Sequence, residues 1–126
     1  MTRVYLVEDS PILAKLLVGL LEAETDVHVI GQADAASTAT EEIVRLAPDL
    51  AIIDLNLRVG TGIDVLRGIG NTGVTPICIV LSNHSSAPYR KAALEAGAHY
   101  FFDKSFEIPL MLAKVRAVRR RSGPPA

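Results

Sequence analysis

Five short apolar runs constrain the fold of this chain more than any other feature. They recur at intervals of roughly 25 residues and cover Val4–Val7, Val27–Ile30, Leu50–Ile53, Ile77–Leu81 and Tyr100–Phe102. Each run is continuously apolar rather than alternating with polar residues, which is typical of strands buried on both faces of a parallel sheet.

Helical patterns lie between these runs, and we expect helices near 11–21, 36–47, 63–69, 92–96 and 110–118. Ser10 is a good N-cap before Pro11, and Gly97 is suited to end the fourth helix in a left-handed conformation. The first helix carries one apolar stripe made of Ile12, Leu13, Leu16, Leu17, Leu20 and Leu21. Strands that alternate with helices predict a doubly wound α/β domain with right-handed crossovers.

The chain has 126 residues, which is the size of one domain. We expect this domain over residues 1–121, followed by a disordered tail over 122–126. Residues 1–110 carry 14 acidic and 8 basic side chains, whereas residues 111–126 carry 5 basic and no acidic ones. An acidic body argues against general nucleic-acid binding. The apolar runs are too short to span a membrane, and no targeting segment precedes them. The single cysteine excludes a disulfide framework. We therefore expect a cytoplasmic protein.

The polar residues of most interest directly follow strands. Glu8 and Asp9 follow the first strand, Asp54 the third, Ser82 the fourth and Lys104 the fifth. Acids in such places often serve only as helix N-caps, but capping does not account for Lys104. If the strand order is 2-1-3-4-5, the first and third strands are neighbours and their three carboxylates converge at one edge of the sheet. Close carboxylates repel each other, and hard oxygen ligands select Mg²⁺ or a similar ion.

Together these residues resemble the receiver domain of two-component response regulators. The resemblance covers residues 3–120 and includes Gly62, which lies eight residues after Asp54. The spacings also match, with 45 residues from Asp9 to Asp54 and 22 from Ser82 to Lys104. The family implies a flavodoxin-like fold of five strand–helix units.

The resemblance assigns a role to each matching residue. Asp54 would accept a phosphoryl group from a phosphohistidine on a sensor histidine kinase or a histidine phosphotransfer protein. Mg²⁺ would be held by Glu8, Asp9, Asp54 and the backbone carbonyl of Asn56. Lys104 and the Ser82 hydroxyl would bind phosphoryl oxygens, and Phe101 would move with Ser82 as a switch. Such a chain is a phosphoacceptor that assists its own phosphorylation and dephosphorylation, and it is not a conventional enzyme.

Some positions depart from the family pattern. Ser105 follows Lys104 where the family commonly has proline behind a cis bond, and we expect the cis bond to be retained to aim the lysine. Leu57 and Arg58 replace the common Met-Pro pair, so we expect a more mobile acceptor loop. Asn56 and His84 occupy positions that, in the family, tune how fast the acyl phosphate hydrolyses.

The family implies that the signal leaves through the fourth helix, the fifth strand and the fifth helix, where Tyr89, Arg90 and Lys91 would lie. Through that surface the chain would control a downstream protein target or an attached output domain, or would form a homodimer. The basic residues Arg116, Arg119, Arg120 and Arg121 suit a solvated helix end, a partner-binding patch or the start of a linker.

Two other functions remain open. One is a phosphorylation-independent interaction module that keeps only the fold, although the full set of site residues argues against it. The other is a flavodoxin-type flavin protein, but the Glu-Asp-Ser-Pro segment after the first strand would repel a phosphate.

Overall fold

A computed structural model gives the fold of residues 1–122, with side chains described as far as residue 119. All but the first residue of the tail expected at 122–126 therefore lies outside the described residues, and residue 122 itself ends a helix. The strands are β1 Thr2–Val7, β2 Val27–Ala33, β3 Leu50–Ile53, β4 Ile77–Ser82 and β5 Tyr100–Asp103. The helices are α1 Pro11–Glu22, α2 Ala36–Leu46, α3 Gly62–Gly70, α4 Ala87–Ala96 and α5 Ile108–Ser122.

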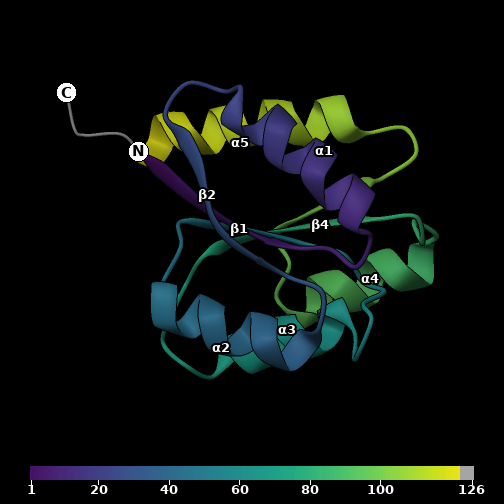
Figure 1. The fold of residues 1–126 in the computed structure, drawn as a ribbon. Coiled ribbons are helices and arrows are strands. Elements are labelled where there is room, and N and C mark those ends of the chain that lie inside the picture. The colour runs from purple at the N-terminus through teal and green to yellow at the C-terminus, as the bar shows by residue number, and fades with distance from the viewer. Residues whose placement is uncertain (123–126) are drawn as a thin grey trace.

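The five strands form one parallel sheet in the order β2-β1-β3-β4-β5, which confirms the predicted topology. Figure 1 shows α1 and α5 on one face of the sheet and α2, α3 and α4 on the other. The register aligns Val7 with Ile53, and Ile53 with Val80. The residues that directly follow β1 and β3 are therefore placed at the same edge of the sheet.

Each face of the sheet has its own apolar core, as expected for strands covered on both sides. Tyr5 and Val7 of β1 pack with residues of α2, α3 and α4, whereas Val4 and Leu6 pack with residues of α1 and α5. The Tyr5 hydroxyl donates a hydrogen bond to the Glu42 carboxylate, which satisfies the one polar atom of this buried ring. The two cores hold the sheet edge in place from both sides.

The predicted ends of two helices are confirmed. The Ser10 hydroxyl caps α1 by accepting a hydrogen bond from the Leu13 amide at 3.3 Å. Gly97 ends α4 at a φ of 121°, which favours glycine.

The apolar stripe predicted for α1 is wider than the face that the helix buries. Ala14, Leu17 and Leu21 are buried, but Ile12 is 85% exposed and Leu16 is 53% exposed. The sheet and α5 cover only one side of α1, so the apolar positions on its outer side remain in solvent.

The loop from β3 to α3 is held tightly against the end of β3. The Gly62 amide donates to the Leu55 carbonyl at 2.9 Å, and Thr61 and Asp64 form a capping box at the start of α3. A Cβ atom on Gly62 would lie 2.3 Å from the Asp54 carbonyl oxygen. Glycine at residue 62 therefore permits the close approach of α3 to Asp54.

Candidate functional site

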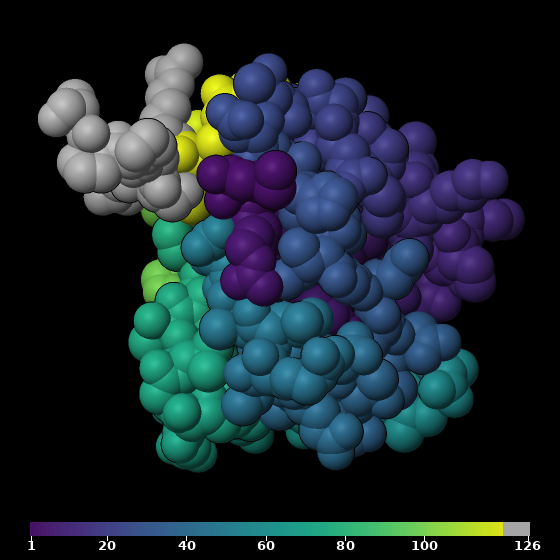
Figure 2. All heavy atoms as spheres, turned by 60° about the vertical axis from the view of Figure 1, so that its left-hand side comes forward, coloured from purple at the N-terminus to yellow at the C-terminus, as the bar shows by residue number. Residues whose placement is uncertain are grey.

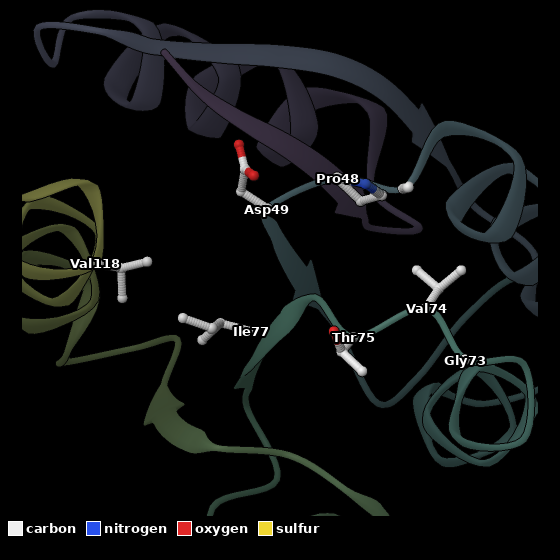
Figure 3. A pocket seen from close by; sticks show the side chains of 8 residues that line it. Pro48, Asp49, Gly73, Val74, Thr75, Ile77 and Val118 are labelled. Atoms are coloured by element: carbon white, nitrogen blue, oxygen red, sulfur yellow. The ribbon is translucent and has the colours of Figure 1, made fainter. Parts of the chain in front are cut away.

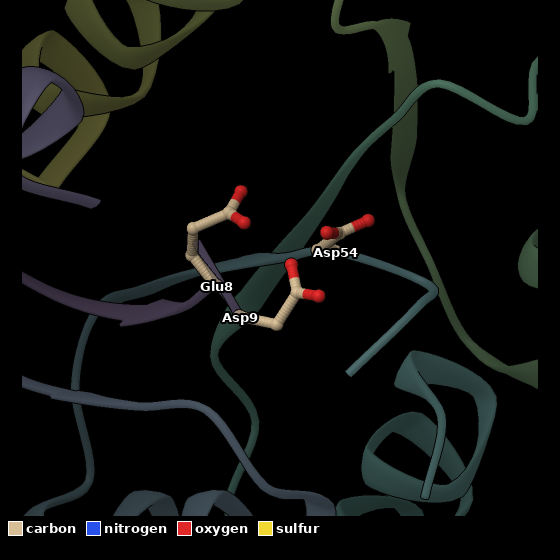
Figure 4. Close-up of side chains that lie close together, drawn as sticks. All are labelled: Glu8, Asp9 and Asp54. Atoms are coloured by element: carbon tan, nitrogen blue, oxygen red, sulfur yellow. The ribbon is translucent and has the colours of Figure 1, made fainter. Parts of the chain in front are cut away.

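Three carboxylates converge at the carboxyl edge of the sheet, as the strand order predicts. Glu8 and Asp9 follow β1 and Asp54 follows β3, and Figure 4 shows all three side chains at this edge. One ligand oxygen from each lies within 4.8 Å of the other two. Glu8 and Asp54 are buried and Asp9 is exposed, so the acidic cluster opens to solvent on the side of Asp9.

Lys104 provides the positive charge that two of these acids face. Its Nζ lies 2.8 Å from Glu8 Oε1 and 2.9 Å from Asp54 Oδ2. Its side chain is only 10% exposed, and its backbone amide donates to the Ser82 carbonyl at 2.9 Å. The loop after β5 is thus aligned with the end of β4, and one ammonium compensates part of the charge of three carboxylates.

The surroundings raise the pKa values of both Glu8 and Lys104. Burial raises the pKa of Glu8 above its ordinary value, even though hydrogen bonds from Lys104 and Ser10 oppose the shift. Burial alone would lower the pKa of the Lys104 ammonium, but its bonds to Glu8 and Asp54 outweigh burial and raise that pKa. Lys104 is therefore charged at neutral pH.

An open pocket of about 330 Å³ lies over the cluster. Its lining residues are Glu8, Asp9, Ser10, Leu13, Asp54, Asn56, Asn83, His84 and Lys104. The lining is mostly polar, and Glu8 and Asp54 are buried while Asp9 is exposed, so a small charged group can approach Asp54 from solvent.

The structure places Asn56 at the rim of this pocket but keeps the Ser82 hydroxyl away from it. The Asn56 amide lies 3.4 Å from Asp54 Oδ1, at the long end of hydrogen bonding. Ser82 is fully buried, and its hydroxyl accepts a hydrogen bond from the His84 amide at 3.1 Å. Ser82 is not among the residues that line the pocket.

Phe101, the expected switch aromatic, is 9% exposed and packs in the core shared with α2, α3 and α4. The guanidinium carbon of Arg90 lies 4.8 Å from the centre of its ring, within the range of a cation–π contact. The aromatic ring is thus directed inward in this structure.

The peptide bond between Lys104 and Ser105 is trans, so the predicted cis bond was wrong. A cis bond before a residue other than proline costs about 2.5–4 kcal/mol. The Ser105 amide also donates to Asp103 Oδ1 at 2.7 Å, a hydrogen bond that proline cannot make. Asp103 rather than a proline ring thus shapes the corner after Lys104.

The loop after Asp54 is tethered at Arg58, where the family commonly has proline. The Arg58 amide donates to the Asp34 carbonyl at 2.9 Å, and its Nε lies 3.0 Å from the Asp34 carboxylate. This pairing lowers the pKa of the Asp34 carboxyl. The greater mobility expected of this loop stays a prediction, and these contacts act against it.

Sequence reasoning missed Asp103 and Glu107, and it placed Arg90 on the output surface without its contacts to them. These three side chains form hydrogen bonds around the loop after β4 and the loop that contains Lys104. Asp103 directly precedes Lys104 at the end of an apolar strand, which was a usable signal. Arg90 had no such signal, because its helix alone suggests an exposed side chain.

The donor set suits a hard divalent cation. Three carboxylates provide the oxygen ligands that Mg²⁺ prefers, and the opening at Asp9 leaves room for the water molecules that Mg²⁺ retains. When bound, such an ion neutralises developing charge on phosphoryl oxygens.

A larger pocket, of about 530 Å³, lies at the opposite edge of the sheet. Figure 2 faces this edge, where the purple start of the chain lies beside blue and teal segments. Figure 3 shows Asp49 as the single acidic side chain among the residues that line the pocket, with Val118 and Ile77 near it.

The comparisons with known proteins agree with the fold and the site. The response regulator receiver domain matches residues 4–116, so the chain belongs to this family of two-component signalling domains. Its acidic triad is typical of a receiver Mg²⁺ site, and membership implies a cognate histidine kinase partner.

Among its relatives, the chain is 37% identical over 123 residues to protein-glutamate methylesterase/protein-glutamine glutaminase 1 of Syntrophus aciditrophicus, covering 96% of this chain and 34% of that protein. It is 35% identical to the KDP operon transcriptional regulatory protein KdpE of Escherichia coli, covering 96% and 52% of the two chains. The chain thus spans about a third to a half of the length of these curated relatives.

Among solved structures, the BeF3-activated N-terminal receiver domain of Klebsiella pneumoniae RstA superposes with a TM-score of 0.84 at 25% identity. The match covers 94% of this chain and 99% of that one. Within the described part of the protein, no helix has both the length and the apolar character needed to cross a membrane.

Proposed function

We propose that this protein is a phosphorylation-controlled signalling switch in which Asp54 accepts a phosphoryl group from a phosphohistidine. The donor is a sensor histidine kinase or a histidine phosphotransfer protein, as receiver family membership supports. Glu8, Asp9, Asp54 and the Asn56 carbonyl hold Mg²⁺ for this reaction. The same family membership supports a cytoplasmic location.

One observation supports this function more than any other: the buried Asp54 carboxylate shares the Lys104 ammonium with Glu8 and lines a pocket that opens to solvent. Phosphoryl transfer depends mostly on positioning the reactants and on neutralising negative oxygens. Asp54 is fixed by the end of β3 and by Gly62, and Lys104 Nζ is 2.9 Å from its carboxylate. The acceptor and one neutralising charge are therefore in place before a donor arrives.

Two side chains have to rearrange as the acyl phosphate forms. A phosphorylated side chain carries about −2 charge and needs hydrogen-bond donors. The Lys104 ammonium turns from Glu8 toward a phosphoryl oxygen, and the Ser82 hydroxyl leaves the His84 amide to reach another oxygen. The space that Ser82 vacates is then filled by Phe101, so Ser82 and Phe101 act together as the switch.

Two exposed apolar side chains at the start of α1 also suggest where the donor docks. Ile12 and Leu16 lie one turn apart at the start of α1 and are both exposed. This helix begins two residues after Asp9, so an apolar partner surface placed on it brings a phosphohistidine to the pocket. Exposed apolar side chains of this kind often mark protein-binding sites.

The output leaves through α4, β5 and α5, and it controls a downstream protein, an attached output domain or a second copy of the chain. Tyr89, Leu94 and Leu110 are each about half exposed on the two helices of this surface. Their exposure gives a partner apolar contact area that a change in α4 or in the start of α5 can alter.

The test is phosphorylation by acetyl phosphate with Mg²⁺, followed by intact mass spectrometry. We expect the wild-type protein to gain about 80 Da, the mass of one phosphoryl group, and Asp54→Asn to gain nothing. Asp49→Asn is the matched control, because Asp49 lies just before the other end of β3, and it should gain the same mass as the wild type. An unmodified wild-type protein, or an adduct on Asp54→Asn, would overturn the assignment.

A further inference from the structure

Arg90 of α4 connects three parts of the molecule through one guanidinium group. Its Nε donates to the Ser85 carbonyl at 2.8 Å, and its Nη1 donates to the Phe101 carbonyl at 3.3 Å. Its Nη2 lies 3.3 Å from Oε1 of Glu107, the residue that directly precedes α5. The planar fork of arginine can reach three acceptors at once, whereas the single ammonium of lysine cannot reach all three in the same geometry.

Glu107 and Asp103 extend these contacts to the loop that carries Lys104. The Asp103 amide donates to Glu107 Oε1 at 2.7 Å, so one carboxylate oxygen receives both Arg90 and Asp103. The Asp103 carboxylate accepts from the Ser105 amide on one oxygen and from the Ser85 hydroxyl on the other. Arg90, Asp103 and Glu107 are called the Arg90 network below.

The network joins the loop that follows Ser82, the last residue of β4, to the loop that begins with Lys104 after β5. Ser82 and Lys104 are the two residues proposed to bind phosphoryl oxygens. Ser85 lies three residues after Ser82, and Asp103 directly precedes Lys104. The Ser105 hydroxyl lies 3.2 Å from the Asn83 side-chain oxygen, which adds a further contact between the same two loops. The loops are therefore linked both through the network and directly.

We propose that the Arg90 network positions Ser82 and Lys104 relative to each other, so that both can close on one phosphoryl group. This role rests on the proposed function and extends it to residues outside the pocket, since neither Arg90 nor Asp103 lines it. Both are positioning residues and do not contact the reacting atoms.

The same contacts give the movement of Ser82 a path to the output surface. When the loop after β4 shifts toward Asp54, the Ser85 carbonyl pulls on Arg90, which also contacts the Phe101 ring and Glu107. An isolated ion pair as exposed as Arg90 and Glu107 contributes little to stability. The network matters because it orients several acceptors together rather than because of one charge pair.

The acidic cluster lies apart from this network, and that separation makes a selective test possible. Glu8, Asp9 and Asp54 accept no hydrogen bond from Arg90 or Asp103 among the contacts of residues 1–119. A variant that disturbs only the network should therefore bind Mg²⁺ normally and bind a phosphoryl mimic poorly.

The experiment measures two dissociation constants for Arg90→Ala and Asp103→Ala. Mg²⁺ binding is followed by calorimetry, and beryllofluoride binding at saturating Mg²⁺ by ¹⁹F NMR. Loss of charge-assisted hydrogen bonds should weaken beryllofluoride binding by about tenfold or more, while the dissociation constant for Mg²⁺ stays within about twofold of wild type. Lys91→Ala is the matched control, because Lys91 is exposed and its ammonium pairs with Glu95 alone among residues 1–119, and it should change neither constant.

Conservative variants separate geometry from charge. Arg90→Lys keeps the charge but not the fork, so it should recover only part of the beryllofluoride affinity. Two outcomes would overturn the inference and leave the proposed function intact. One is wild-type beryllofluoride affinity in both alanine variants. The other is an equal loss of Mg²⁺ and beryllofluoride affinity in Arg90→Lys and Asp103→Asn. A wild-type protein that does not bind beryllofluoride would instead overturn both.

Discussion

The two ends of β3 carry aspartates in opposite situations. Asp54 follows the strand at the smaller pocket, of about 330 Å³, and Asp49 precedes it at the larger one, of about 530 Å³. Both pockets are open, so size alone would favour the edge with Asp49. The chemistry favours the other edge, because among the described residues that line these two pockets, several ionisable side chains come together only at the smaller one.

The polar groups around Asp49 are already paired with one another. Its carboxylate accepts from the Arg3 amide at 2.8 Å, and its own amide donates to the Arg3 carbonyl at 2.9 Å. The Arg3 guanidinium donates to the carbonyls of Leu46 and Ala47 at the end of α2. Asp49 is therefore part of the fold, whereas the acids around Asp54 retain a charge that only one lysine offsets.

Of the substitutions at the two ends of β3, removal of Lys104 beside Asp54 should change the free energy of unfolding most. Loss of one partner from a buried ion pair leaves an uncompensated charge, so we expect Lys104→Ala to lower the free energy of unfolding by about 3 kcal/mol without divalent ions. Urea unfolding measures this change. The exposed Lys91→Ala serves as control, with a loss below about 0.5 kcal/mol. An equal loss in both variants would show that Lys104 is not compensating buried charge.

Mg²⁺ should stabilise the protein through the Asp54 edge alone. At 100 times its dissociation constant, we expect the ion to raise the free energy of unfolding by about 2.7 kcal/mol. Asp9→Asn should lose most of this gain because a charged ligand is removed, and Asp49→Asn should retain it. Denaturant unfolding with and without Mg²⁺ measures both, and a full gain in Asp9→Asn would contradict the proposed ligand set.

Removing the Asp49 carboxylate should cost less and leave the chemistry unchanged. Asp49→Ala deprives the Arg3 amide of its acceptor, for which we expect a loss of about 1 kcal/mol in the free energy of unfolding. Phosphorylation by acetyl phosphate should proceed at the wild-type rate, as measured by intact mass over time. A slower reaction would mean that the two edges are coupled through β3.

The smallest expected effect on stability is that of Asp103→Asn, and it depends on pH. Hydrogen bonds from the Ser85 hydroxyl and the Ser105 amide hold the pKa of this carboxyl below its ordinary value of 3.8. A carboxyl with a lowered pKa stabilises the folded state fully above its unfolded pKa, and this contribution is lost as pH falls through the folded pKa. The stability difference between wild type and Asp103→Asn should therefore shrink as pH falls below 3.8. Thermal unfolding from pH 6 to pH 3 measures it, and a constant difference would contradict the assignment.

The sequence was sufficient to predict the sheet, because β1, β3 and β4 are almost wholly apolar and buried and each crossover contains a helix. It also predicted that Glu8, Asp9 and Asp54 meet, because strand order determines which strand ends are neighbours. The trans bond after Lys104 was predictable from Ser105 itself, since a cis bond before a residue other than proline costs about 2.5–4 kcal/mol, and the family pattern led to the wrong prediction. Arg90 was expected on the output surface, but its contacts were missed because its three acceptors come from separate segments, and no local pattern relates them.

Some side-chain orientations also lay beyond sequence reasoning. Ser82 was correctly placed at the end of β4, but the direction of its hydroxyl depends on the turn to His84. Ile12 and Leu16 were expected in the apolar stripe of α1, yet the number of apolar residues on a helix does not determine how much of it its neighbours cover.

The close approach of Gly62 to Asp54 has a consequence for genetics. A methyl group at residue 62 would lie 2.3 Å from the Asp54 carbonyl oxygen, so even alanine must displace the acceptor or the start of α3. A screen for loss of signalling should therefore recover substitutions at residue 62 together with those at the acidic residues. Intragenic suppressors of such alleles would arise in the β3–α3 loop, where added length relieves the overlap, and not in the pocket itself.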